Sequence, residues 1–498
     1  MDRSTAKVAR ATAKPLPVTP QSKDKHLAVP RAESRGRILT EKERNCIGRM
    51  TQHASRSLTE GSLWKNILLF SIPLMLSNVL QVLFNMSDVA VVGRFAGPAA
   101  LGSVGSTTTL TALITGLVLG MGSSVNVCTA RFLGAKRDDE VEKTVHTSLI
   151  LCFLSGVLIA VTGVVCARGI LSLLHTKEEL LDGAVLYFRI YVLGMPAMGV
   201  FNFGSGVYAA AGETKRPLYY LLSAGVINVL LNLFFVIVLR MDVMGVALAS
   251  VISQYLSAFL VLGALLRCRE VYGVRLSRLS LDREKARMVL ALGIPSAMQN
   301  AIFQVANLFI QTGVNSFDAV TVEGAAAAQN ADALVYDVMA AVYTACSSFI
   351  SQNFGAGKRD RILKSYFVSL AYSFGFGLLL GCSLVLFGNG FLSLFTSDAA
   401  VMAEGMYRLR VMGLSYGFSA FMDNSIAASR GLGKSVVPTV IVILGSCVFR
   451  VIWVYTIFAY FHTITSLYLL YIFSWTITAI AEIIYFARCY RRETRKAA

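Results

Sequence analysis

The chain has 498 residues, of which 55% are hydrophobic and only 15% are charged. Soluble globular chains carry about 25% charged and 45–50% apolar residues, so this composition excludes a soluble enzyme, a secreted disulfide scaffold and a disordered protein. The net charge of +17 would point to nucleic acid in a soluble protein, whereas in a membrane chain its position relative to the bilayer decides its meaning. The nine cysteines are scattered without a C-x-x-C pair, which indicates small apolar residues rather than disulfides or a metal site.

Residues 1–61 form the first predicted segment. Up to residue 60 they hold 13 Lys and Arg, 6 Asp and Glu, and four prolines, a composition typical of a disordered basic tail. The first apolar run is too long for a signal peptide. An alternative is that translation begins at Met50, in which case residues 1–49 are not part of the mature protein.

Twelve apolar stretches follow the tail, and each is long enough to cross a bilayer, which takes about 20 residues. We therefore predict an all-α polytopic membrane protein with twelve transmembrane helices, and the even number places both termini on the same side. The predicted spans are 66–93, 98–130, 141–167, 184–210, 217–239, 243–266, 289–316, 320–352, 362–386, 403–429, 435–459 and 464–487.

The distribution of basic residues supports this count. Loops on the side of the termini hold 24 Lys and Arg, and the opposite loops hold 4. Because basic loops stay in the cytoplasm, we expect a multi-pass protein of the plasma (inner) membrane with both termini cytoplasmic. The positive charge then lies beside anionic membrane lipids, and no nucleic acid partner is needed to explain it.

The two halves of the chain repeat each other. The pair Ile72-Pro73 recurs at 294–295, and Gly134-Ala135 recurs at 355–356, in the same order and at almost the same spacing. The repeat predicts two pseudo-symmetric six-helix lobes related by an axis along the membrane normal, as in one class of secondary transporter. The predicted boundaries are 62–266 for the N-lobe, 267–288 for a cytoplasmic basic linker, 289–490 for the C-lobe and 491–498 for a basic C-terminal tail.

Polar side chains within the spans of the N-lobe are the first candidate functional residues, because ionisable groups in a membrane helix are costly. Asp88 lies in the first span, with Gln81 seven residues earlier on the same helix face. Asn228 and Asn232 share one face of the fifth span at i, i+4. The alternatives are a carboxylate solvated at the helix end and amides that bond a neighbouring helix.

The C-lobe carries further acidic and amide side chains. They form either a cation or proton site or structural ion pairs with Arg189, Arg410 and Arg450. Function is favoured for Asp337 and Asp423, and we expect Glu482 to reach the membrane surface or to pair with Arg488. The C-lobe candidates are Asp332, Asp337, Asp423 and Gln304.

These residues together resemble the multidrug and toxic compound extrusion (MATE) transporters, prokaryotic type. The resemblance covers about 62–490, and each of its motifs is short. It is carried by Pro73, Gln81, Asn85, Asp88 and Val92-Gly93-Arg94 in the first span, by Gly134-Ala135-Lys136, and in the second lobe by Gln352-Asn353-Phe354-Gly355-Ala356-Gly357 and Arg430-Gly431-Leu432-Gly433.

The resemblance implies antiport, in which H⁺ or Na⁺ enters while an organic, cationic and amphipathic compound leaves. It also implies an N-lobe cation site, with Asn232 standing where the family has a second aspartate. With a single carboxylate, we expect one H⁺ or one Na⁺ per cycle. Gln304 lies near the position of an acidic residue that other members use in the C-lobe. The N-lobe site matches Gln81, Asp88, Asn228, Asn232 and Ser250.

The expected mechanism is alternating access by a monomer, without enzymatic activity and without a cofactor. Desolvated beside amides, Asp88 would favour a neutralised form that holds H⁺ or Na⁺. Two other functions remain open at this point. One is a lipid-linked oligosaccharide flippase of related architecture, against which the acidic residues argue, and the other is a non-transporting membrane receptor or assembly protein.

Overall fold

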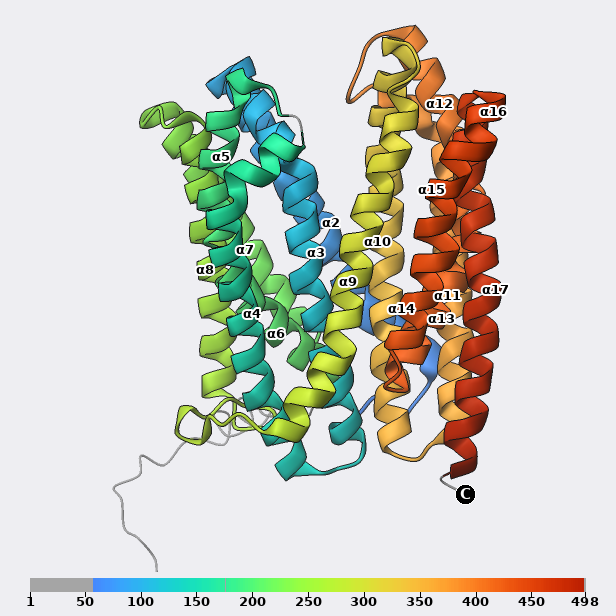
Figure 1. Ribbon diagram of the computed structural model, residues 1–498. Helices are drawn as coiled ribbons and strands as arrows, with labels where there is room; N and C mark the ends of the chain where they lie inside the picture. Colours follow the sequence, from blue (N-terminus) through green and yellow to red (C-terminus); the bar gives the residue numbers. More distant parts are fainter. Residues whose placement is uncertain (1–56, 175, 497–498) are drawn as a thin grey trace, which may run out of the picture. The chain divides into compact units, whose positions relative to one another are not determined.

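The computed structural model describes residues 57–174 and 176–496, which are helical and contain no β-strand (Figure 1). The predicted tail and the alternative start at Met50 lie outside the described residues, except for 57–61. The N-lobe consists of α2 (Leu63–Val91), α3 (Pro98–Gly134), α4 (Asp138–Leu173), α5 (Glu178–Val192), α6 (Met195–Ala210), α7 (Lys215–Leu233) and α8 (Asp242–Arg267). The C-lobe consists of α9 (Arg283–Val314), α10 (Ala319–Gly355), α11 (Arg359–Leu392), α12 (Ala399–Gly413), α13 (Tyr416–Gly431), α14 (Val436–Val442), α15 (Phe449–Trp453), α16 (Ala459–Phe461) and α17 (Ile464–Lys496).

Every predicted span falls on a helix or on a run of consecutive helices. In the described part of the chain, ten helical runs are long and apolar enough to cross a membrane, and the bent pair α5 and α6, at 43°, makes an eleventh. The remaining predicted span is the broken pair α12 and α13, whose Arg and Asp residues lower its hydropathy. Both broken pairs interrupt the helix at positions that correspond in the sequence repeat, Leu193 and Leu414.

Helix boundaries differ from the predicted ones around the linker and at the C-terminus. Helix α9 begins at Arg283, inside the predicted linker, because the Asp282 side chain accepts hydrogen bonds from the first free amides of the helix. Helix α17 continues to Lys496, so most of the predicted C-terminal tail is helical.

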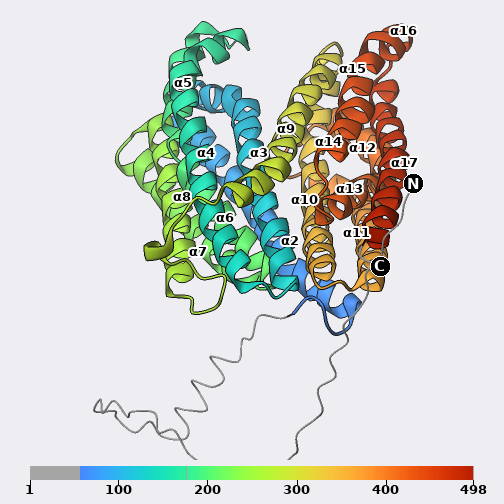
Figure 2. The same cartoon turned by 60° about the horizontal axis from the view of Figure 1, so that its bottom comes forward.

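The first helix of each lobe reaches the second helix of the other lobe (Figures 1 and 2). Asn78 of α2 donates to the carbonyl of Asp337 in α10 at 2.8 Å, and Asn300 of α9 donates to the carbonyl of Gly116 in α3 at 3.0 Å. The two asparagines correspond to each other in the sequence repeat, and so do their two acceptors. The internal repeat of the sequence is therefore also a repeat of contacts between the lobes.

The lobes meet most closely at one end, which we call the basic end: the α3–α4 turn (135–137), the α10–α11 turn (356–358) and the linker (268–282). Asn126 and Ser348 exchange hydrogen bonds of 2.8 and 3.0 Å between α3 and α10. A Cβ on Gly134 would meet the carbonyl oxygen of Gln352, so only glycine allows this approach. The opposite end, which carries the start of α3, is called the far end.

Candidate functional site

Asp88 stands at the junction of three helices in the far half of the N-lobe. Its Oδ1 accepts a hydrogen bond from Asn232 Nδ2 of α7, and its Oδ2 accepts one from Ser250 Oγ of α8 at 3.2 Å. Asn232 Nδ2 also donates to Asn228 Oδ1 at 3.3 Å. The structure therefore brings together four of the five N-lobe residues singled out in the sequence.

The spacing of the two asparagines creates this geometry. Residues at i and i+4 lie above one another on a helix, so both amides face α2. Asn228, Asn232 and Ser250 are all buried. Asn232 Oδ1 has no hydrogen-bond partner, which is rare for a buried amide oxygen and leaves an acceptor free beside Asp88.

Two tyrosines of α5 complete the surroundings of Asp88. Tyr187 and Tyr191 stack with ring centroids 5.8 Å apart, and the Asp88 charge acts on both hydroxyls. Sequence analysis missed them, because an aromatic pair at i, i+4 has the same pattern as core packing. Within the described residues, no basic side chain lies within 4.0 Å of Asp88, so its charge has no protein counter-ion.

Gln81 does not take part in this network. It lies seven residues before Asp88, which is about 10 Å along the helix, towards the basic end. Its side chain is partly buried and makes no hydrogen bond to any residue that the structure describes.

In the C-lobe, Asp332 of α10 is engaged in an ion pair. Its Oδ2 accepts from Arg408 Nη2 at 2.6 Å and from Arg408 Nε at 3.1 Å, and its Oδ1 accepts from the Tyr416 hydroxyl. The partner is neither Arg410 nor another of the arginines expected from the sequence. A shift of two residues turns a helical side chain by about 200°, and Arg408 lies on the buried face while Arg410 is exposed.

Asp423 and Glu482 form a second buried group. One oxygen of Asp423 and both oxygens of Glu482 lack hydrogen-bond partners, and the guanidinium of Arg430 acts electrostatically on both carboxyls. Arg430 itself donates to Gln299 at 2.8 Å. The expectation that Glu482 reaches the surface or pairs with Arg488 is wrong, because its side chain is fully buried within the C-lobe.

The remaining C-lobe candidates stand apart. The side chains of Asp337 and Gln304 are partly buried and make no hydrogen bond in the described part of the chain. No hydrogen bond links any two of the four C-lobe candidates there, so only the N-lobe candidates assemble into one polar site.

The N-lobe site offers oxygen atoms to a ligand. The Asp88 carboxylate, the free Asn232 Oδ1, Asn228 Oδ1 and the Ser250 hydroxyl are groups that suit a hard cation, and a carboxylate also accepts a proton. The described residues contain no cluster of three His, Cys, Asp or Glu side chains able to hold a metal ion. The arrangement fits a single monovalent cation or a single proton.

Comparison with known proteins matches both lobes to one family. The MatE family model matches residues 73–234 and again 295–456, two segments of equal length that coincide with the two copies of the repeat. The chain is 28% identical over 388 residues to "Probable multidrug resistance protein YoeA" of Bacillus subtilis (strain 168), covering 76% of this chain and 84% of that protein. It is 24% identical over 357 residues to an FAD transporter of Shewanella oneidensis, covering 70% and 78%.

The fold is shared with solved structures. One, described as an outward-facing conformation of a multidrug resistance MATE family transporter of the MOP superfamily, superposes with a TM-score of 0.82 at 21% identity. The superposition covers 89% of this chain and 99% of that one. The likeness confirms the predicted fold class, an all-α membrane protein with two lobes.

Proposed function

The chain belongs to the MatE family of multi-pass membrane transporters, and from that premise we propose that it exports small organic compounds by antiport coupled to H⁺ or Na⁺. The exported compounds are organic cations of amphipathic character, and the site of coupling is Asp88. The protein works as a monomer in the plasma membrane, with the basic end and both termini in the cytoplasm, where basic loops are retained.

The observation that carries this proposal is the unpaired charge of Asp88. A carboxylate within a membrane helix is costly unless it is neutralised, and the described residues offer it hydrogen-bond donors but no cation. A proton, a sodium ion or a cationic substrate would each supply the missing positive charge. Competition of a coupling ion and a cationic substrate for one carboxylate is the simplest basis of antiport.

The contacts of Asp88 link its charge to the packing of three helices. The ionised carboxylate accepts bonds from α7 and α8, and bonds to a charged acceptor are about twice as strong as neutral ones. Neutralisation weakens these bonds and loosens α2 from α7 and α8. Since α2 also contacts α10 through Asn78, this change is transmitted to the C-lobe.

Alternating access is supported by the contacts that close the basic end, none of which recurs among the described residues of the far end. The bonds between Asn126 and Ser348 and the close approach at Gly134 hold the two lobes together there. In the described residues, no hydrogen bond joins the lobes beyond the level of Asn78 and Gly116. This arrangement fits a transporter closed to the cytoplasm, and Asp88 lies in the half that is not held shut.

The test is efflux of ethidium from transporter-deficient cells that produce the wild type or Asp88→Asn, with and without an imposed pH or Na⁺ gradient. We expect gradient-driven efflux from the wild type and its loss in Asp88→Asn. The matched control is Asp182→Asn, because Asp182 is an exposed carboxylate that pairs with Arg168 on the far side. Undiminished gradient-driven efflux by Asp88→Asn would refute the assignment of the coupling site.

A further inference from the structure

Two groups of contacts at the basic end join the start of one lobe's first helix to the start of the other lobe's third helix. The ion-pair clamp joins α9 of the C-lobe to α4 of the N-lobe and centres on Lys285 and Glu140. The carbonyl clamp joins residues 57–61, which lead into α2 of the N-lobe, to Lys358 and Arg361 at the start of α11 in the C-lobe.

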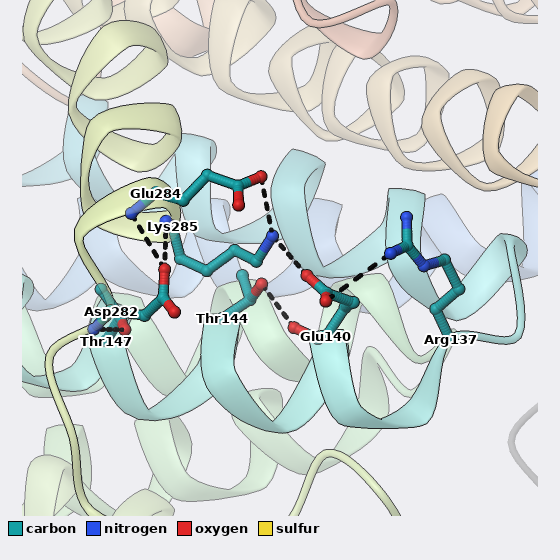
Figure 3. A network of polar contacts seen from close by, with 7 residues as sticks. All are labelled: Arg137, Glu140, Thr144, Thr147, Asp282, Glu284 and Lys285. Carbon is teal, nitrogen blue, oxygen red and sulfur yellow. Dashed lines mark hydrogen bonds and ion pairs between the residues drawn. The ribbon is translucent and has the colours of Figure 1, made fainter.

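The ion-pair clamp places a buried charge between the lobes (Figure 3). The ammonium of Lys285 pairs with Glu140 and lies 4.6 Å from the centre of the Phe132 ring. Only 4% of the Lys285 side chain is exposed, so its charge needs compensation. Glu140 supplies it across the lobes, and the exposed carboxylate of Glu284, at 3.3 Å, supplies it from within α9. Beside it, the Asp282 amide donates to Thr147 Oγ1 at 3.0 Å.

In the carbonyl clamp, the cations donate hydrogen bonds to backbone carbonyls. Arg361 donates to the backbone carbonyls of Gly61 at 3.0 Å, Glu60 at 3.3 Å and Leu58 at 3.5 Å. Lys358 Nζ donates to the carbonyl of Thr59 at 2.9 Å. Figure 2 shows the blue start of the N-lobe beneath α11, at the C-lobe.

The two clamps occupy equivalent places in the repeat. Glu140 corresponds in the sequence to Arg361, and Arg137 corresponds to Lys358 at the same spacing. The chemistry differs, because the ion-pair clamp joins the lobes through oppositely charged side chains, whereas the carbonyl clamp joins them through two cations that bond to backbone carbonyls. Each clamp fixes a first helix to the opposite lobe, so separation of the lobes at the basic end has to break both.

We propose that Lys285 and Arg361 are positioning residues of the transport cycle, which hold the basic end closed and release together when it opens. The two clamps together then form a gate at the basic end. Residues 57–61 belong to this gate, because their backbone carbonyls bind Lys358 and Arg361. The inference rests on alternating access, part of the proposed function, but not on Asp88 as the coupling site. Loss of either clamp should shift the population from the state closed at the basic end to the state open there.

The test measures access from both sides of the membrane, in a variant whose native cysteines are replaced by alanine. Ser347→Cys reports on the basic end, where Ser347 lines a cavity of about 100 Å³ between the lobes. Asn330→Cys reports on the far half of α10, where the Asn330 side chain is exposed. The rate of reaction with a membrane-impermeant maleimide is measured in vesicles of known orientation.

We expect Arg361→Gln and Lys285→Gln each to raise the rate of maleimide reaction at position 347 and to lower it at position 330. The rise should be roughly tenfold, because that is the scale of losing a hydrogen bond to a charged group. The double variant should raise the rate at position 347 more than either single variant does. Lys364→Gln, which removes an exposed charge one turn further along α11, and Arg361→Lys, which keeps the charge of the clamp, should stay near the wild type.

Unchanged rates in both Gln variants would overturn the proposal. A rise of the labelling rate at both position 347 and position 330 would also overturn it. A loosened fold makes both positions more accessible, whereas opening a gate at the basic end makes position 347 more accessible and position 330 less so. Labelling needs no ion gradient, so this result is independent of what Asp88→Asn does to efflux.

Discussion

Neutralising Asp332 should destabilise the C-lobe without affecting ion coupling. Asp332→Asn keeps the size of the side chain but removes the charge that compensates Arg408, which is 5% exposed. The two hydrogen bonds from Arg408, at 2.6 and 3.1 Å, then end on a neutral amide. An uncompensated buried charge costs about 3 kcal/mol, both in protein interiors and at the centre of a membrane helix.

This cost translates into a measurable change of the unfolding temperature. With an unfolding entropy of about 2 cal/mol/K per residue, a chain of 498 residues loses about 1 °C of Tm for each kcal/mol. We therefore expect Asp332→Asn to lower the Tm by about 3 °C, measured by tryptophan fluorescence of the protein in detergent. The matched control is Asp360→Asn, because Asp360 is exposed at the start of α11.

A double variant separates lost charge compensation from lost packing. Arg408→Met removes the buried cation and fills much of its volume, so Asp332→Asn combined with Arg408→Met should be more stable than Asp332→Asn alone. Gradient dependence of efflux should persist in both, since Asp332 does not contact the Asp88 site. An unchanged Tm in Asp332→Asn, or a double variant less stable than either single one, would refute the reasoning.

Three further predictions concern the gate and the coupling site. Lys285 holds the pKa of Glu140 below its usual value, so the pair between Glu140 and Lys285 is fully present above pH 4.5 and is lost as the pH falls through the lowered pKa. Maleimide labelling at the basic end should rise there in the wild type, and it should rise less in Glu140→Gln, in which Glu284 is the carboxylate left beside Lys285. Gly134→Val should prevent closure of the basic end, because its side chain meets the backbone of the facing helix, and equal labelling of variant and wild type at that end would contradict this. Asn232→Asp puts a second carboxylate beside Asp88 and should raise the number of ions moved per substrate in proteoliposomes; an unchanged ratio would contradict the one-carboxylate, one-ion rule.

Local patterns in the sequence predicted the part of the candidate site that depends on spacing along one helix. Asn228 and Asn232 had to share a face, because residues four apart on a helix lie above one another. Their position opposite Asp88 followed from the family resemblance and not from the spacing, and so did Ser250. Gln81 shows the limit of such reasoning, because a shared face does not bring side chains about 10 Å apart into contact.

The C-lobe shows what spacing leaves open. Asp332 and Asp423 both appear as acids in apolar helices, yet one is compensated by Arg408 and the other has an oxygen without a partner. Which arginine faces which acid depends on the rotation of neighbouring helices about their axes. Glu482 was misjudged for the same reason, since the sequence does not reveal which face of α17 turns inward.

The sequence by itself determined the membrane class, the helical spans, the duplication and the excess of positive charge at one end. These properties follow from bilayer thickness, from the demand that backbone groups in lipid bond internally, and from a repeat that can be read along the chain. Only the tertiary structure decided which carboxylates are paired and that each first helix is clamped to the opposite lobe. Such contacts join residues that lie far apart in the sequence, and their partners are chosen by the packing of whole helices rather than by any local pattern.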